Sequence, residues 1–159
     1  MNQGTKVWAR VFRITLAGLA GGLAGNGVLG LVFTNPLLRN VLYDPALQSP
    51  LYMEVTSRRN VPISLAGLVL LSIIHSWLFD VLRPSLPGQT WVRKGLFWGL
   101  TIWLVYWVFQ EWFVYRTLLG EPLLLNFLEL VVLLLGSLVE GTTIAYFLHR
   151  TAVREQPGG

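Results

Sequence analysis

Ionisable side chains inside apolar stretches are the residues of this chain that could do chemistry. Glu111, Glu129 and Glu140 lie in runs of aliphatic and aromatic residues, and His75 lies in another such run. An ionised side chain at the centre of a bilayer costs about 2.5–3.5 kcal/mol on insertion scales, so these groups must face the protein interior or be neutral. Buried carboxyl and imidazole groups can pass protons between them. The residues are therefore candidates for a proton relay, or for a polar axis that only holds helices together.

The spacing of the glutamates predicts how they are arranged. Residues 129, 133, 136 and 140 alternate steps of four and three, so Glu129 and Glu140 share one helix face. With antiparallel neighbours and a rise of about 1.5 Å per residue, Glu111 falls near the depth of Glu129, and His75 near that of Glu140. We expect two polar layers, Glu111 with Glu129 on the outer side and His75 with Glu140 on the inner side.

No familiar catalytic or cofactor motif accompanies these residues. The chain has no cysteine, which excludes disulfides, thiolate metal sites and cysteine nucleophiles. It has two histidines and no Glu-x-x-His pair, so a di-iron site or a bis-histidine haem is not expected. The G-x-S-x-G, H-E-x-x-H and Walker-type motifs are also missing from the sequence. The sequence therefore predicts neither a bound metal nor another cofactor.

The composition is that of a membrane protein. The 159 residues are 53% hydrophobic and 13% charged, and their mean hydropathy is +0.57. The basic residues behind the formal charge of +4 lie in short segments beside apolar runs and do not alternate with aromatic residues as in a nucleic-acid interface. We therefore expect contact with a lipid bilayer and none with nucleic acid.

Four apolar stretches are long enough to cross a bilayer, which takes about 20 helical residues. They cover residues 14–33, 62–82, 96–115 and 123–147. A signal peptide is the alternative for the first stretch, but this stretch is long and lacks a small-residue cleavage site, so we expect a retained helix. The sequence predicts an all-α fold, a single membrane domain built as a four-helix bundle.

The basic residues predict the orientation of this bundle. Eight Lys and Arg residues flank the spans on the side of the termini and four lie on the other side. Because cytoplasmic segments carry the excess of Lys and Arg, both termini are predicted inside the cell, in the inner (plasma) membrane. A flexible tail is expected over residues 148–159. Asp80, near the inner end of the second span, is expected to reach water or to pair with Arg83.

The outer loop, residues 34–61, is longer than a helix bundle requires. Residues 37–42 favour a short helix on the membrane surface, and Pro45 and Pro50 are expected to end it. The following residues, 52–60, carry charged side chains that suit a partner or lipid headgroups, with a solvated connector as the alternative.

A row of small or polar residues recurs every four positions in the first span, at Gly18, Gly22, Asn26 and Gly30. Such a face lets another helix approach closely. The approaching helix can belong to the same chain, to a second copy or to a partner membrane protein.

The third span is rich in aromatic residues, and Trp103 and Trp107 lie in its middle. At α-helical spacing they share a stripe with Glu111, because the three positions are four residues apart. This face could line a pocket for a quinone, a pigment or an acyl chain. Packing or lipid contact is the alternative role for the two indoles.

The last third of the chain resembles a group of small bacterial membrane proteins with four predicted helices. The resemblance rests on the run of residues 109–122 (FQEWFVYRTLLGEP), on Glu129 and on residues 138–141 (LVEG). It implies the four-helix architecture and a prokaryotic inner membrane, and it transfers no activity or site residue to this chain.

Three classes of function fit these features. The sequence favours a non-catalytic accessory subunit or assembly factor that uses the glycine row and the outer loop for contact. A small proton-coupled carrier or proton-conducting protein would use the two polar layers, and predicts a polar cavity that reaches the glutamates. An enzyme acting on a lipid or an isoprenoid would use the Trp103 and Trp107 face, and predicts an opening bordered by aromatic rings.

Overall fold

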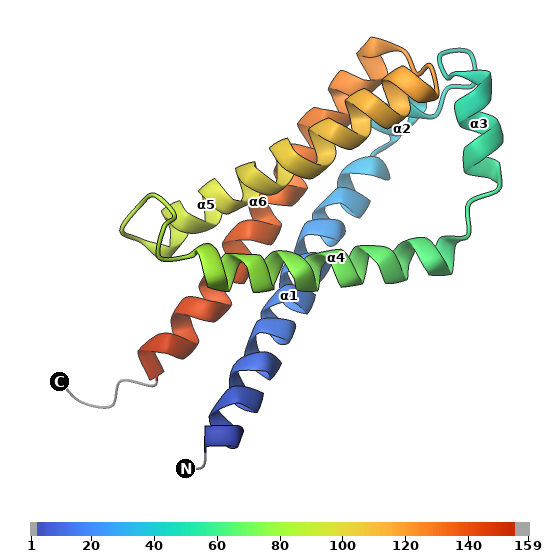
Figure 1. Cartoon of the computed structure of the whole chain (residues 1–159). Helices are drawn as coiled ribbons and strands as arrows, with labels where there is room; N and C mark the ends of the chain where they lie inside the picture. Colours follow the sequence, from blue (N-terminus) through green and yellow to red (C-terminus); the bar gives the residue numbers. More distant parts are fainter. Residues whose placement is uncertain (1–2, 155–159) are drawn as a thin grey trace.

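The computed structural model describes the backbone of residues 3–154 and the side chains of residues 4–149. This part of the chain is all-α, as predicted, with six α-helices and two π-helical segments (Figure 1). The elements are α1 (Gln3–Phe33), α2 (Pro36–Leu42), α3 (Pro50–Ser57), α4 (Val61–Leu82), α5 (Trp91–Ile102), η1 (Trp103–Trp107), η2 (Gln110–Leu118) and α6 (Leu123–Arg154).

Within these residues, three helices are long and apolar enough to cross a membrane: Gly4–Phe33, Val61–Leu82 and Leu123–His149. The chain is therefore a helical membrane protein in contact with lipid, and these helices contain the first, second and fourth predicted spans. α6 continues to Arg154, so residues 148–154 of the predicted flexible tail are helical. Residues 155–159 of that tail lie outside the described residues.

The third predicted span, residues 96–115, is helical but not α-helical throughout. α5 ends at Ile102, and η1 and η2 continue the helical path to Leu118. A π-helical turn has i→i+5 hydrogen bonds and therefore turns side chains away from their α-helical positions. Of the stripe predicted for Trp103, Trp107 and Glu111, the last two line the same cavity, whereas Trp103 does not.

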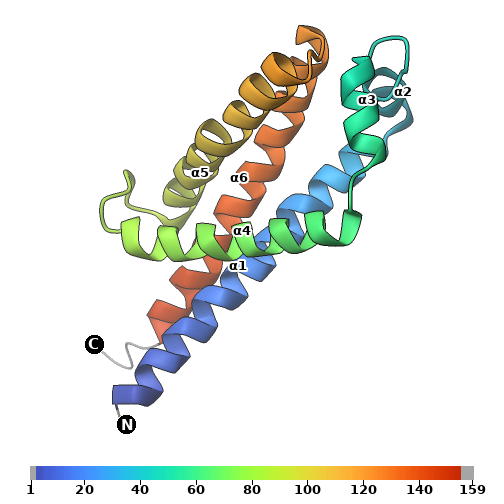
Figure 2. The same cartoon turned by 45° about the vertical axis from the view of Figure 1, so that its right-hand side comes forward.

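The first turn of α1 and the last turn of α6 lie at one end of the bundle, here called the terminal end, whereas α2, α3 and the turn before α6 lie at the other, the loop end (Figures 1 and 2). α5 and α6 form an antiparallel hairpin held by glycines. A Cβ added at Gly95 would lie 2.7 Å from Thr142 Cα, and Gly99 and Gly141 meet through backbone atoms. This close approach needs glycine, because any side chain would push the two helices apart.

α4 crosses α1 at a wide angle (Figure 2). The crossing point is the glycine row of α1, where a Cβ on Gly18 would lie 2.7 Å from Ile73 Cα and one on Gly22 would meet the side chain of Ser72. The buried side chains of α4 all belong to its C-terminal half, from Ser72 onward. The N-terminal half diverges from α1 and leaves space between them.

A cluster of buried apolar side chains closes the bundle toward the terminal end. Four helices contribute to it: Ile14 and Ala17, Phe79, Trp98 and Ile102, and Ile144, Ala145 and Leu148. Phe79 and Trp98 pack with their ring centroids 6.0 Å apart. This cluster, called the terminal seal below, separates the middle of the bundle from the terminal end.

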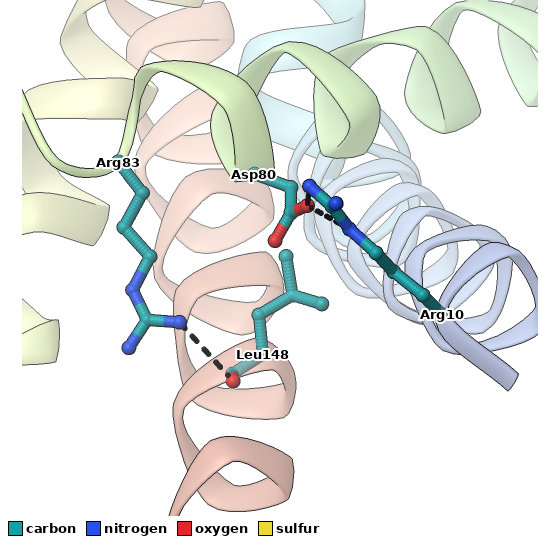
Figure 3. A network of polar contacts seen from close by, with 4 residues as sticks. All are labelled: Arg10, Asp80, Arg83 and Leu148. Carbon is teal, nitrogen blue, oxygen red and sulfur yellow. Dashed lines mark hydrogen bonds and ion pairs between the residues drawn. The ribbon is translucent and has the colours of Figure 1, made fainter. Parts of the chain in front are cut away.

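The ion pair of Asp80 differs from the prediction. Arg10 of α1 donates to Asp80 Oδ2 from Nη2 at 2.6 Å and from Nε at 3.0 Å (Figure 3). Arg83 instead donates to the carbonyl oxygen of Leu148 at 3.4 Å. The predicted pair of Asp80 with Arg83 is wrong, because the crossing of α1 and α4 brings the Arg10 guanidinium to the Asp80 carboxylate instead. Together these contacts tie α1, α4 and α6.

The outer loop contains one helix more than predicted. α2 matches the short helix expected at residues 37–42, but Pro50 begins α3 instead of ending a helix. Ser49 caps α3, and proline is favoured in the first helical turn because its missing N–H has no partner there. The Ser49 hydroxyl also donates to the carbonyl oxygen of Leu119, which ties the loop to the turn before α6.

Candidate functional site

A cavity of about 670 Å³ opens at the loop end, between the diverging half of α4, the end of α1, the outer loop and η2. This volume is typical of sites for small organic ligands. Its polar lining is Asn26, Tyr43, Tyr52, Arg59, Ser64, Tyr106, Gln110, Glu111, Tyr115 and Glu129, and its apolar lining includes Leu29, Phe33, Leu68, Leu71 and Leu133.

The outer predicted layer forms the deepest polar part of this cavity. Glu111 of η2 is 1% exposed and Glu129 of α6 is 8% exposed, and both carboxyl-bearing side chains line this cavity close enough for their charges to interact. Two neighbouring carboxylates that are withdrawn from water repel each other, which favours one proton shared between them. Asn126 Nδ2 donates to Glu111 Oε2 at 3.2 Å and holds it in place. The pair is thus arranged to hold one proton and one negative charge.

A third carboxyl, which the sequence interpretation left in a turn, lies close to this pair. Glu121 precedes Pro122 at the start of α6 and is fully buried, and neither of its carboxyl oxygens has a hydrogen-bond partner among the described residues. Burial, with a smaller contribution from the charge of Glu129, raises the pKa of Glu121 to about 7. Arg116 binds the carbonyl oxygen of Glu121 at 2.8 Å instead of its carboxyl.

The inner predicted layer is also brought together. His75 Nδ1 of α4 lies 2.9 Å from Glu140 Oε1 of α6, and each residue is 8% exposed. A void of about 10 Å³ beside them is about the size that one water needs. Five residues line both this void and the large cavity: Asn26, Leu29, Leu68, Leu71 and Trp107. The two layers are thus separated by one narrow, mostly apolar constriction.

The predicted pocket tryptophans have different positions. Trp107 lies at the constriction between the two cavities, whereas Trp103 donates from Nε1 to the carbonyl oxygen of Leu130 at 2.8 Å and packs toward α6. Trp103 therefore does not line the cavity, because η1 turns it away from the side that Trp107 faces.

The predicted glycine row also divides into two parts. Gly18 and Gly22 pack against α4 of the same chain, and Asn26 lines the cavity and donates to the carbonyl oxygen of Gly22 at 2.8 Å. A Cβ on Gly30 would meet nothing within 4 Å. The row is therefore occupied at the crossing and open toward the loop end.

Tyrosines form much of the wall of the cavity, and the sequence interpretation did not single them out. Tyr52 of α3 and Tyr115 of η2 pack edge to face with centroids 5.5 Å apart, and Gln110 donates to the Tyr115 hydroxyl at 2.9 Å. Burial and the charge of Glu129 raise the pKa of Tyr43 and of Tyr52, so both hydroxyls stay protonated at neutral pH. A loop tyrosine gives no sign in the sequence that it folds back over a membrane helix.

Comparison with known proteins identifies no relative, so the function is inferred from this geometry. No family model, no curated protein and no solved structure matches the chain. In the part of the chain that the structure describes, no group of three or more His, Asp and Glu side chains is arranged to hold a metal ion. What the arrangement offers is two buried, neighbouring carboxyl groups in the lining of a large cavity that tyrosines also line.

Proposed function

We propose that this chain is a small proton-coupled carrier of the inner (plasma) membrane. The observation that carries the proposal is that a cavity at the loop end is lined by two neighbouring buried carboxyl groups, those of Glu111 and Glu129. A carrier needs such a site, because solute and proton must bind where each affects the affinity for the other. Intramembrane carboxyls are otherwise costly and mark ion or proton pathways.

The proposal includes four membrane crossings with both termini in the cytoplasm. The helical path from Trp91 to Leu118 supplies the crossing that joins α4 to α6, since it is long enough and packs along α6 over its whole length. The eight Lys and Arg residues at the terminal end support the orientation. The cavity then opens toward the outside of the cell.

Alternating access requires one side of the site to be closed while the other is open. The terminal seal and the pair of Arg10 with Asp80 close the path below His75 and Glu140. Toward the loop end the cavity is open. The structure thus has the asymmetry expected of an outward-open carrier.

α4 is the element that we propose to move. It rests on α1 at Gly18 and Gly22, and its N-terminal half leaves the wall of the cavity incomplete. Gly30 of α1 and Gly67 of α4 have nothing within 4 Å of an added Cβ, so the diverging halves have room to close together. A rocking motion of α4 on this crossing, in which its N-terminal half moves toward α1 and its C-terminal half lifts away, would close the loop end and separate Asp80 from Arg10.

The predicted accessory subunit is supported less well by the same geometry. Its main contact surface, the glycine row, is covered by α4 at Gly18 and Gly22. One observation favours the alternative of an enzyme that acts on a lipid or an isoprenoid, because tyrosines line the cavity beside Trp107. Neither alternative explains why two buried carboxyl groups are neighbours in the lining of the cavity.

Proton movement into liposomes that contain the purified protein tests the proposal. We expect an imposed pH gradient to decay faster with wild-type protein than with Glu111→Gln, Glu129→Gln or Glu140→Gln. Glu54→Gln is the matched control, because Glu54 is exposed, pairs only with Arg58 at 2.9 Å in α3 and lies outside the cavity lining. Equal decay with wild type and Glu129→Gln would contradict a proton-coupled carrier.

A further inference from the structure

We propose that the cavity takes a hydrophobic organic cation with one positive charge, which binds in place of the proton shared by Glu111 and Glu129. The inference rests on the proposed carrier function and specifies its substrate class. In the exchange the cation enters from the loop end, the shared proton leaves to water in the cavity, and no covalent bond forms.

Charge conservation at the carboxyl pair favours a monovalent cation. With its proton, the pair carries one negative charge in a site withdrawn from water. Removing that proton without a replacement would leave two adjacent carboxylates that repel each other and are poorly solvated. A single positive charge from the ligand restores the total charge of the site to minus one. A neutral or anionic ligand at the same place would leave this cost uncompensated.

The walls of the cavity favour an organic cation over a metal ion. Tyr43, Tyr52, Tyr106, Trp107 and Tyr115 present aromatic rings, whose faces attract cations. Leucine side chains and Phe33 supply apolar surface for the rest of the ligand. A metal ion would need several more oxygen ligands than the pair supplies, and the described residues contain no suitable group of three.

Among the described residues, Arg59 is the one basic side chain that lines the cavity, and it provides the critical test. It is exposed, and its Nε donates to the hydroxyl of Ser64 at 3.0 Å, which holds it on the α4 side of the mouth. Water screens a charge in such a position. If Arg59 recognised the ligand, the site would select anions or zwitterions, and neutralising Arg59 would weaken binding.

Several other groups face the carboxyl pair and can affect the pH dependence of cation binding. They come from every element around the cavity: Asn26 of α1, Tyr43 after α2, Tyr52 of α3, Arg59 before α4, Ser64 of α4, Tyr106 of η1, Tyr115 of η2, Glu121 in the turn, and Asn126 of α6. Glu121 is the further carboxyl that can exchange a proton when the cation binds, because burial raises its pKa to about 7. A Glu121→Gln variant separates its contribution from that of the pair.

Calorimetric titration of the purified protein in detergent provides the experiment. The probes are tetraphenylphosphonium and tetraphenylborate, which have the same shape and opposite charge. We expect tetraphenylphosphonium to bind at least about tenfold more tightly, and to release a proton that a weakly buffered solution detects. Glu129→Gln should lose about tenfold or more of this affinity, whereas the control Glu54→Gln should keep it and Arg59→Gln, which removes a positive charge from the lining, should bind the cation at least as tightly.

Three outcomes would overturn the assignment: preference for tetraphenylborate, unchanged affinity in a Glu129→Gln protein that elutes as a folded species in gel filtration, or loss of binding in Arg59→Gln. The liposome assay distinguishes an error in the proposed substrate class from an error in the proposed carrier function. Proton movement that depends on Glu129 together with anion-selective binding would refute the substrate class alone. Tight cation binding without any Glu129-dependent proton movement would refute the carrier and leave a cation-binding protein.

Discussion

His75 Nδ1 of α4 lies 2.9 Å from Glu140 Oε1 of α6, although 65 positions separate them in the sequence. This contact joins α4, which crosses α1, to α6, which also carries Glu129 of the outer carboxyl pair. Both residues are buried, so a partner left alone after mutation would have few other groups to bind. The contact therefore contributes to stability as well as to any proton path.

The first prediction concerns that contact. His75→Ala and Glu140→Ala should each lower the free energy of unfolding by about 1–3 kcal/mol, because each leaves a buried polar group without its partner. The double variant should lose less than the sum of the two losses. Thermal unfolding of the purified variants in one detergent provides the measurement, and strictly additive losses would show that the two side chains do not interact.

The second prediction concerns the crossing of α1 and α4. Gly18→Val should destabilise the protein by roughly 1–3 kcal/mol, because its Cβ would lie 2.7 Å from Ile73 Cα and the two helices must separate. Gly27→Ala is the matched control on the same helix, since nothing lies within 4 Å of an added Cβ there. Alanine in place of a helical glycine should stabilise by about 0.5–1 kcal/mol. Equal melting temperatures for both variants would contradict the crossing.

The third prediction concerns pH. Burial raises the pKa of Glu121 from 4.5 to about 7, so the folded protein holds this proton more tightly than the unfolded chain. The folded state then binds more protons between these two values, and stability must fall as pH rises from 4.5 toward 7. Glu121→Gln should remove this part of the pH dependence and be more stable than wild type at pH 8. A pH profile unchanged by the substitution would show that Glu121 is not buried in this way.

The sequence alone predicted which residues meet in the two polar layers, because the depth of a residue along a helix follows from simple geometry. A helix rises by a fixed amount per residue, and antiparallel order places residue 111 near residue 129 and residue 75 near residue 140. No side-chain detail was needed for that inference. The same arithmetic failed for Trp103, since it assumed α-helical turns where η1 forms a π-helix.

Other features depend on tertiary geometry that no local pattern contains. Asp80 pairs with Arg10 because of the angle at which α4 crosses α1, and i,i+3 spacing pointed to Arg83 instead. Glu121 is buried because the outer loop folds over the turn before α6, where Ser49 binds Leu119. From the sequence alone, Glu121 has the properties of any charged residue in a polar turn.

The fourth prediction tests the closing of the loop end. Phe33 of α1 and Ser64 of α4 both line the cavity, and the chain has no cysteine. In the double variant Phe33→Cys and Ser64→Cys, we expect oxidation in liposomes to form a disulfide within the chain whenever α4 swings toward α1. The disulfide should stop proton movement, and a reductant should restore it. Full proton movement with the disulfide formed would contradict a moving α4.

The fifth prediction concerns the gate at the terminal end, where Arg10 donates twice to Asp80 Oδ2. Arg10 is exposed, and such pairs are worth about 0–1 kcal/mol, so Asp80→Asn should leave the protein folded. That small loss still shifts an equilibrium between two conformations by up to about fivefold. If the rocking motion of α4 breaks the pair, Asp80→Asn should speed the disulfide formation described above by up to this factor. Exchange of the charges, Arg10→Asp with Asp80→Arg, should return the rate toward that of wild type. A rate that stays the same in Asp80→Asn would mean that the two ends of α4 are not coupled, and the cavity would then be a binding site without alternating access.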